Sequence, residues 1–271
     1  MTIAVDCAGC GHHYEAEPVG GHRVLCGDST NPDDIARLLD GAQADMVWTD
    51  PPYGVDYVGK TKNALTIQND GSEGLREFIT SALQAIRGGV RPGSPWYLAS
   101  PAGTRGTTFR LALEDAGWEF HQELVWVKDV FVMGHSDYHY RHEPILYGWL
   151  PGPGRSGRGK HEGSRWEGDH AQQSVFEVPR PKRSEEHPTM KPVALVEAML
   201  LNSSRQGHVV LDAFGGSGTT LIACVQVGRV ARLMEKDERY ADVIVRRYQE
   251  QTGVKPVLES TGEPHDFTLD T

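Results

Sequence analysis

The sequence has few cysteines, no long apolar run and too little positive charge to balance its acids. Its four cysteines are too few and too scattered for a secreted disulfide framework. No apolar run is long enough to span a bilayer, and no signal-peptide pattern is present. These absences argue against a membrane protein and predict a cytoplasmic one. The length suffices for one sizeable core and a small appendage.

The formal net charge of −10 argues at first against a nucleic-acid partner. Residues 151–186 reverse this balance, because basic residues outnumber acidic ones there and glycine is frequent. Arginine and lysine interleaved with tryptophan are typical of a surface that contacts phosphates and bases. A flexible, solvated insertion is the alternative interpretation. The candidate nucleic-acid contacts in this segment are Arg155, Arg158, Lys160, Arg165 and Trp166.

The glycine-rich turn at 212–219, Asp-Ala-Phe-Gly-Gly-Ser-Gly-Thr, lacks two common nucleotide-binding patterns. It has neither the Gly-Lys-Ser/Thr of a Walker loop nor the G-x-G-x-x-G spacing. It still follows a strand pattern and precedes a helix pattern. Glycines there let a ligand approach the backbone, and a helix N-terminus offers free N–H groups. Glu235 ends the next strand, where an acid is placed to hold ribose hydroxyls.

A second unusual turn, Thr49-Asp50-Pro51-Pro52-Tyr53, follows the short apolar strand 45–48. Two prolines stop the strand, and the first holds Asp50 extended at the strand's carboxyl edge, where open α/β sheets bind ligands. The Asp50 carboxylate and the Pro51 carbonyl are paired acceptors that suit an –NH2 group, and the Tyr53 ring suits stacking. The turn therefore predicts a pocket for an exocyclic amine on an aromatic base. An ordinary turn with a capping aspartate is the alternative.

Strand and helix patterns alternate with short links, as in βαβ units of a parallel sheet. No helix pattern separates runs 119–128 and 143–149, so we expect them to form an antiparallel pair that closes one edge. The long polar stretch 54–71 is interpreted as a lid that carries Lys60 and Lys62 to nucleic acid, or as disorder. The expected strands are 23–26, 45–49, 95–100, 119–128, 143–149, 209–212 and 229–234. The expected helices are 32–39, 73–86, 104–116, one from Pro192, and 237–251.

Two groups of metal-ligand residue types are not assigned to a metal site. Cys7-x-x-Cys10 resembles half of a zinc knuckle, but a structural zinc needs four ligands and no second pair follows. A loose N-terminal arm is the favoured interpretation, and zinc binding there stays open. His135, His139 and His142 lack a close carboxylate pattern, so we interpret them as solvated or hydrogen-bonded histidines.

Three motifs in a fixed order carry a resemblance to a known family. They are Asp-Pro-Pro-Tyr at 50–53, His-Pro-Thr-Met-Lys-Pro at 187–192 and Phe-x-Gly-x-Gly at 214–218. Together they resemble the beta-class amino-methyltransferases of DNA, over about residues 23–250. The resemblance implies the Rossmann-like α/β fold of class I S-adenosylmethionine-dependent methyltransferases. Its seven-stranded, mainly parallel sheet would be circularly permuted, with strands 209–212 and 230–234 as first and second and strands 23–27 and 45–49 as third and fourth.

The same resemblance divides the chain and assigns its cofactor site. The expected parts are an N-terminal arm (1–22), a catalytic half (23–150), a target-recognition insertion (151–186), an S-adenosyl-L-methionine-binding half (187–252) and a flexible tail (253–271). Glu235 would take the ribose hydroxyls of the cofactor, and Asp28 would lie beside its adenine. Asp212 would lie near the amino group of its methionine, and Lys191 near the carboxylate. The other expected cofactor-binding positions are Asp50, His187, Thr189, Phe214, Gly216, Ser217, Gly218 and Thr219.

In the implied reaction, the catalytic residues Asp50, Pro51, Pro52 and Tyr53 would hold a base flipped out of duplex DNA. An amine conjugated with its ring is a poor nucleophile. Hydrogen bonds to Asp50 and the Pro51 carbonyl would favour its tetrahedral form and align it with the sulfonium methyl. Catalysis would be mostly orientation and electrostatics. No cysteine follows a proline, as a C5-cytosine enzyme would require.

Several alternatives are weighed against this function. Aspartate at the first motif position favours adenine N6 over cytosine N4, while an enzyme acting on RNA stays a further alternative. Intact Asp50, Tyr53 and Glu235 argue against an inactive DNA-binding protein, and the glycine spacing argues against a dinucleotide-dependent oxidoreductase.

The expected partner is double-stranded DNA with a short target site, and related proteins are often homodimers. Such a restriction–modification enzyme would work in a prokaryotic cell or a phage-infected host.

Overall fold

The computed structural model describes residues 3–6, 13–16, 21–54, 74–131, 133, 137–152, 166–181 and 190–268, the first two ranges by their backbone only. Its centre is an eight-stranded sheet. Across the sheet the order is β3 (Arg23–Cys26), β10 (Val230–Glu235), β9 (Val209–Asp212), β4 (Met46–Thr49), β5 (Pro95–Ala99), β7 (His142–Trp149), β6 (Glu119–Val127) and β8 (Val175–Glu177).

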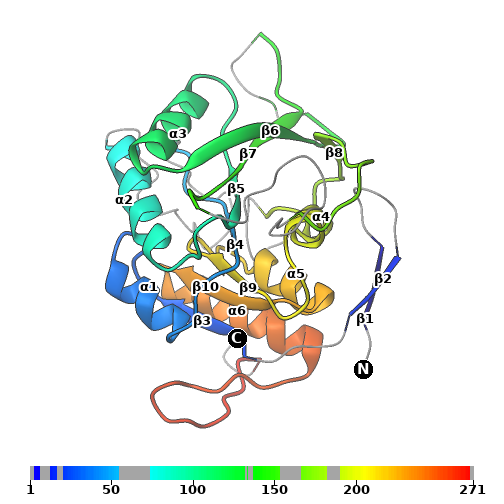
Figure 1. Cartoon of the computed structure of the whole chain (residues 1–271). Coiled ribbons are helices and arrows are strands. Elements are labelled where there is room, and N and C mark those ends of the chain that lie inside the picture. The colour runs from blue at the N-terminus through cyan, green and yellow to red at the C-terminus, as the bar shows by residue number, and fades with distance from the viewer. Residues whose placement is uncertain are drawn as a thin grey trace.

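The strand order confirms the expected α/β fold and its permutation. The strands assigned as third, second, first and fourth of the methyltransferase sheet are β3, β10, β9 and β4, and they lie side by side in that order. These four strands and β5 are parallel. Strand β7 runs antiparallel to both of its neighbours, β5 and β6. The chain thus joins two halves at β4 and β9, strands that lie far apart in the sequence (Figure 1).

The edge of the sheet differs from the expectation. The β6–β7 pair is antiparallel as predicted, but β8 adds parallel to β6 and forms the edge in its place. Strand β8 comes from residues 151–186, which we expected to be an insertion. Phe176 and Val178 are buried there, and Trp126 Nε1 donates to the Val178 carbonyl at 2.7 Å. A three-residue strand with one inward side chain leaves too short an alternation to detect in the sequence.

Six helices of the described chain cover both faces of the sheet. One hydrophobic cluster packs α1 (Pro32–Leu39), α2 (Leu75–Gly88) and α3 (Thr104–Asp115) against one face. A second cluster packs α4 (Val193–Ser203), α5 (Thr219–Val227) and α6 (Glu238–Thr252) against the other. Both faces of the parallel strands are therefore buried, which explains their nearly uninterrupted apolar sequences.

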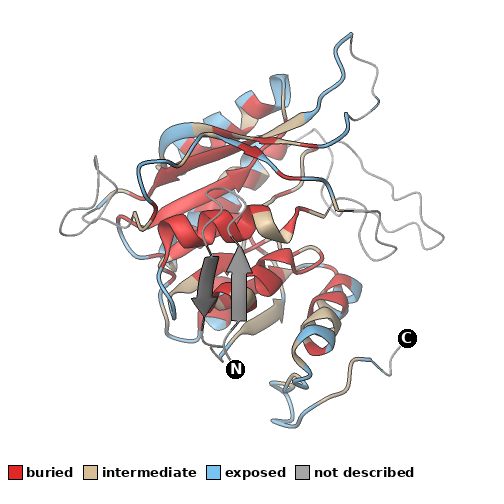
Figure 2. Ribbon diagram, turned by 90° about the vertical axis from the view of Figure 1, so that its right-hand side faces the viewer, coloured by how far each residue is buried: buried red, intermediate tan, exposed pale blue. Residues whose placement is uncertain are grey.

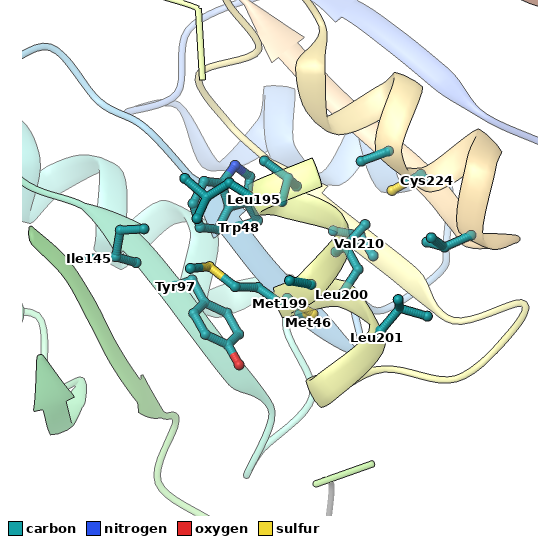
Figure 3. Packing of buried hydrophobic residues seen from close by; sticks show 14 of the residues in the cluster. Met46, Trp48, Tyr97, Ile145, Leu195, Met199, Leu200, Leu201, Val210 and Cys224 are labelled. Carbon is teal, nitrogen blue, oxygen red and sulfur yellow. The ribbon is translucent and has the colours of Figure 1, made fainter. Parts of the chain in front are cut away.

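Helix α4 forms the centre of the second cluster. Every residue from Leu195 to Ser203 is buried, so the helix is red along most of its length in Figure 2. Leu195, Met199 and Leu200 have no exposed surface and point toward Trp48 and Tyr97 of the sheet (Figure 3). Each such side chain contributes about 1.5–3 kcal/mol through burial. The cluster therefore fixes the position of the residues that precede α4, including Lys191.

Both ends of the chain are more structured than expected. Residues 3–6 and 13–16 form the antiparallel strands β1 (Ile3–Asp6) and β2 (His13–Ala16), which lie beside α5, in place of a loose arm. Residues 253–268, expected as a flexible tail, are held to the fold by side-chain contacts. Arg23 and Arg37 bind Glu259, and Gln249 Nε2 donates to Asp266 Oδ1 at 2.6 Å.

The described part of the chain contains no helix that is both long and apolar enough to cross a membrane.

The close packing around Gly148 can be tested by substitution. It lies in β7, where an added Cβ would be 1.9 Å from the Glu119 carbonyl oxygen and 2.6 Å from Trp96 Cζ2. Because the backbone of β6 has little room to move, Gly148→Ala should lower the free energy of unfolding by about 1–3 kcal/mol, measured by urea denaturation. Gly88→Ala is the matched control, since nothing lies within 4 Å of its added Cβ. Equal stability of the two variants would contradict the close β6–β7 packing.

Candidate active site

Acidic residues gather where the parallel strands end. Asp212 and Glu235 are the last residues of β9 and β10, Asp50 follows β4, and Asp28 lies two residues after β3. These four strands are neighbours and parallel, so their carboxyl ends meet at one edge of the sheet. The structure thus brings the two sequence motifs together at the edge where α/β sheets bind ligands.

Glu235 is bonded to the glycine turn. Its Oε2 accepts from Gly216 N at 2.8 Å, and its Oε1 accepts from the N–H groups of Lys236 and Asp237 at 2.9 and 3.0 Å. Burial raises the pKa of Glu235, although these three donors favour its ionised form. Gly216 and Gly218 both have positive φ, 53° and 82°, a conformation that glycine adopts without strain. The carboxylate therefore fixes the turn whose backbone faces the sheet edge.

Asp28 follows β3, the strand that pairs with the end of β10 where Glu235 lies. Its Oδ2 accepts from Lys236 Nζ at 2.8 Å, and its Oδ1 accepts from the Thr30 amide and hydroxyl at 2.9 and 2.7 Å. Partial burial opposes ionisation, but the lysine and the threonine donors outweigh it and lower the pKa of Asp28 to about 2. Asp28 is therefore a fixed anion at the end of β3, next to the strand that Glu235 ends.

Asp212 begins the glycine turn and is only 2% exposed. Its Oδ1 accepts from Thr49 Oγ1 and from Phe214 N, both at 3.1 Å, and its Oδ2 accepts from Thr220 Oγ1 at 2.6 Å. Burial raises the pKa of Asp212 to about 7, against the effect of these donors. Because its bonds reach β4 and α5, Asp212 joins the turn to both neighbouring elements.

The other residues of the glycine turn lie together where α5 begins. Phe214 is partly buried and packs edge-on against Phe78, with ring centroids 5.9 Å apart. Ser217 and Thr219 are buried, and the Thr219 hydroxyl donates to the Lys191 carbonyl at 3.3 Å. This last bond connects the glycine turn to the segment that carries the second motif.

The turn after β4 meets Lys191 from that segment. Lys191 Nζ lies 2.6 Å from Asp50 Oδ2 and 3.2 Å from the Tyr53 hydroxyl. Pro51 is buried and Pro52 partly buried, while the Tyr53 ring packs edge-on against Phe109 at 5.9 Å. Asp50 keeps 26% of its side chain exposed, whereas Lys191 keeps 8%. The carboxylate is therefore the accessible member of this ion pair.

Two charged residues that the sequence analysis missed complete the cluster. Glu143 of β7 lies 3.2 Å from Lys191 Nζ through Oε2, and it accepts from the Tyr53 hydroxyl at 3.4 Å. Its Oε1 pairs with Lys128, which follows β6. Burial favours the neutral acid, but Lys191 and Lys128 outweigh it and lower the pKa of Glu143 to about 2. In the sequence, Lys128 and Glu143 are visible only as charged residues at the ends of two apolar strand patterns. That they form a pair becomes clear only when the antiparallel register is known.

Several predicted site residues lie outside the described residues. They are the cofactor candidates His187 and Thr189 and the nucleic-acid candidates Lys60, Lys62, Arg155, Arg158, Lys160 and Arg165. Trp166 is described, and it lines a cavity with Tyr97, His121 and Asn202. Asn202 is near the C-terminal end of α4, and Lys191 precedes the N-terminal end. The helix has eleven residues and is roughly 16 Å long, and the cavity and Lys191 are at its opposite ends.

The described residues show no group of three or more histidine, cysteine or acidic side chains suited to a metal ion. His139 stacks on Phe131 with ring centroids 5.3 Å apart, and His142 packs edge-on against Tyr140 at 5.7 Å. The structure thus places these two histidines in ring contacts. His135, Cys7 and Cys10 lie outside the described residues.

The buried Asp212 generates a pH-dependent stability test. An unfolded aspartate releases its proton near its ordinary pKa of 3.8, whereas folded Asp212 keeps it to about 7. This group therefore lowers stability as the pH rises through that window. Thr220→Val removes the donor to Oδ2, so the folded pKa rises further and the loss continues above about pH 7. We expect urea denaturation to show a cost of about 1–3 kcal/mol at alkaline pH and a smaller cost at acidic pH.

Thr80→Val is the control for the lost hydroxyl. Thr80 Oγ1 is buried and has no hydrogen-bond partner among the described residues. Its replacement should therefore cost little, and equally at both pH values. A Thr220→Val cost that does not change with pH would contradict the role given to the Thr220–Asp212 bond.

The comparison with known proteins agrees with this geometry. The sequence model of the family N6_N4_Mtase, described as DNA methylase, matches residues 44–246. The chain is 25% identical over 246 residues to the Type II methyltransferase M.HpaI of Haemophilus parainfluenzae, covering 83% of this chain and 73% of that protein. It is also 25% identical over 240 residues to the Type II methyltransferase M2.MboI of Moraxella bovis, covering 80% and 83%.

Solved structures share the fold at low sequence identity. The M1.HpyAVI–SAM complex superposes with a TM-score of 0.60 at 20% identity, covering 84% of this chain and 100% of that one. The cytosine-N4-specific PvuII DNA methyltransferase superposes with a TM-score of 0.61 at 12% identity, covering 84% and 88%. The family match spans most of the chain and includes the turn after β4, Lys191 and the glycine turn. The chain belongs to the DNA methylase family of N4/N6 amino-methyltransferases.

Proposed function

We propose that this protein transfers a methyl group from S-adenosyl-L-methionine to the exocyclic N6 of adenine in duplex DNA. The observation that carries the proposal is the position of Asp50. Its carboxylate is fixed at the end of β4, next to the Tyr53 ring, and 26% of its side chain is open to solvent. A rigid acceptor beside an aromatic ring is the arrangement that a planar base with an amino group requires.

The residues at the sheet edge fit the cofactor. Glu235 ends β10 and Asp28 follows the adjacent β3. Glu235 Oε2 and Asp28 Oδ2 each accept from one protein donor, which leaves a lone pair on each for a ligand. They would bind the ribose hydroxyls and the adenine side of the cofactor. Gly216, with positive φ, would leave the turn backbone open to the methionine part, beside Phe214, Ser217 and Thr219. Gly218 would support the turn by close packing, because an added Cβ there would lie 2.9 Å from Ile244 of α6. When bound, S-adenosylmethionine supplies an electrophilic methyl group.

Lys191 would bind the carboxylate of the methionine part, and its backbone is already tied to Thr219. His187 and Thr189 are proposed to lie close by, because they belong to the same motif. Asp212 would act on the cofactor through the turn, since its own oxygens are used by Thr49, Phe214 and Thr220.

The protein would act on the base by orientation and charge. Asp50 and the Pro51 carbonyl would each accept one hydrogen of the amine, and Pro52 would keep the turn stiff. These bonds favour a tetrahedral nitrogen whose lone pair points toward the methyl group. The Tyr53 ring would hold the base plane. Burial raises the pKa of Tyr53 well above its usual value, so its hydroxyl stays protonated in this setting.

The described residues of the loop between β6 and β7 support a nucleic-acid partner. Residues between β6 and β7 expose Phe131, Met133 and Tyr138 to 52%, 76% and 89%. The loop starts at Lys128 and ends next to Glu143, so its base is part of the active-site cluster. Exposed aromatic rings at such a position are suited to stack on bases of a substrate whose target has been flipped out.

Nucleoside mass spectrometry tests the proposal. Purified protein, unmethylated duplex DNA and S-adenosylmethionine are incubated, and the digested DNA is examined for methylated bases. We expect N6-methyladenine, whose mapped positions give the target site. N4-methylcytosine would contradict the assignment of the base that rests on Asp50. Methylation of RNA in place of DNA would contradict the proposed partner.

Two substitutions should separate the roles of the two turns. Asp50→Ala removes the amine acceptor, so methyl transfer should fall below detection while calorimetry shows cofactor binding retained. Glu235→Ala removes the ribose acceptor and a bond to Gly216, so the cofactor Kd should rise by roughly 10- to 100-fold. An unchanged Kd in Glu235→Ala, or equal loss of binding and transfer in Asp50→Ala, would contradict this division.

A further inference from the structure

The contacts of Lys191 with two carboxylates assign a role to Glu143. We infer that Glu143 is a positioning residue that holds the Lys191 ammonium, so that Asp50 can release it and accept the amine of the target base. This inference rests on the proposed function, because it explains how Asp50 becomes available for catalysis.

The ion pair of Lys191 with Asp50 explains why a second anion is needed. One oxygen of the acceptor proposed for the target amine is already in use, since Lys191 Nζ lies 2.6 Å from Asp50 Oδ2. An amine that binds this oxygen competes with Lys191 for it. Lys191 is only 8% exposed, so its charge cannot turn to bulk water when the bond to Asp50 opens. Before the cofactor carboxylate is bound, a buried ammonium without another counter-ion is costly, and this cost would oppose binding of the base.

Glu143 offers the displaced ammonium a second anion without a large movement. Its Oε2 is 3.2 Å from Lys191 Nζ, and the Tyr53 hydroxyl is also 3.2 Å from the same nitrogen. When Asp50 turns to the base, Lys191 therefore keeps one carboxylate and one hydroxyl as partners. A shift of a few tenths of an ångström toward Glu143 would give a normal charged hydrogen bond.

Lys128 keeps Glu143 in place for this role. It pairs with Oε1, leaving Oε2 directed at Lys191, and it is itself 8% exposed. Lys128 Nζ also lies 5.2 Å from the centre of the Trp126 ring, a cation–π contact. Glu143 lies in β7, and Lys128 directly follows β6, the strand paired with it. Trp126 of β6 is opposite Glu143 in the register. The anion is thus fixed by the sheet and does not move with the turn that carries Asp50.

The four charges alternate along one chain of contacts, Asp50 to Lys191 to Glu143 to Lys128. Their formal charges sum to zero, and each ion contacts at least one ion of opposite sign. Lys191 and Lys128 lower the pKa of Glu143 to about 2 in spite of burial, which keeps it ionised at neutral pH. Removing the negative charge of Glu143 alone would leave Lys191 more dependent on Asp50.

Replacement of Glu143 is therefore expected to affect the binding of the target base and the binding of the cofactor differently. In Glu143→Gln, Lys191 stays paired with Asp50, so engagement of the base should weaken by roughly 10- to 100-fold. The cofactor carboxylate also binds Lys191 in the proposed function, and it loses an anionic competitor. The Kd of S-adenosylmethionine should therefore stay within about twofold of the wild-type value or decrease. A residue that only supports the fold would weaken both.

The experiment uses the mapped target site in two labelled duplexes, one with the target base and one with an abasic sugar in its place. Fluorescence anisotropy gives the Kd of each duplex, and calorimetry gives the Kd of S-adenosylmethionine. We expect Glu143→Gln to weaken binding of the intact duplex only. In an Asp50→Asn background the same change should add no further loss, because asparagine forms no ion pair with Lys191.

Glu123→Gln is the matched control. Glu123 lies on β6 and pairs with Arg110 at the surface, so its replacement removes an ion pair outside the site. It should bind both duplexes and the cofactor as the wild type does. Parallel loss of cofactor and of both duplexes in Glu143→Gln would overturn the inference in favour of a purely structural role. Unchanged binding of the intact duplex would overturn it too.

Failure of the proposed function has a different signature. Wild-type protein that binds no S-adenosylmethionine and methylates no nucleic acid would remove the proposed reaction, and the inference with it. Active wild-type protein with a normal Glu143→Gln variant would remove the inference alone.

Discussion

The buried positive charge of Lys191 constrains the site more than any other single group. An ammonium that is 8% exposed needs anions around it, and it obtains them from the turn after β4 and from β7. Its own backbone carbonyl accepts from Thr219, at the start of α5. One residue therefore connects the turn that carries Asp50, the antiparallel part of the sheet and the glycine turn. In the proposed function, the relative positions of the base and the cofactor would depend on this connection.

The sheet makes such a connection rigid. Strands β4 and β9 are neighbours, and a buried hydrogen bond from Thr49 to Asp212 ties their carboxyl ends together. Helix α4, enclosed on nearly every side, fixes the segment before it, where Lys191 lies. The site is accordingly built on strand ends and a buried helix. This is the kind of support that holds reacting groups to within the small tolerances that orientation effects require.

The sequence predicted those parts of the candidate site whose structure depends on neighbouring residues in the chain. The turn after β4 and the glycine turn have unusual compositions because prolines and glycines fix the backbone itself, and Glu235 is placed by the strand it ends. The pairing of Lys128 with Glu143 depends on the β6–β7 register, which no local pattern specifies. Strand β8 is too short to show a period. The tail is held by Glu259, whose partners Arg23 and Arg37 are more than two hundred residues away.

That last contact has a consequence for the architecture. The Arg23 guanidinium at the beginning of the first sheet strand lies 3.1 Å from Glu259, beyond the last helix. The start of the eight-stranded sheet and the segment after the last helix therefore meet at one place. Because these two points are adjacent, the packing of the sheet does not dictate which of its strands comes first in the chain. A rearrangement that joined them and opened the chain elsewhere would change the order of the motifs and keep the order of the strands in the sheet.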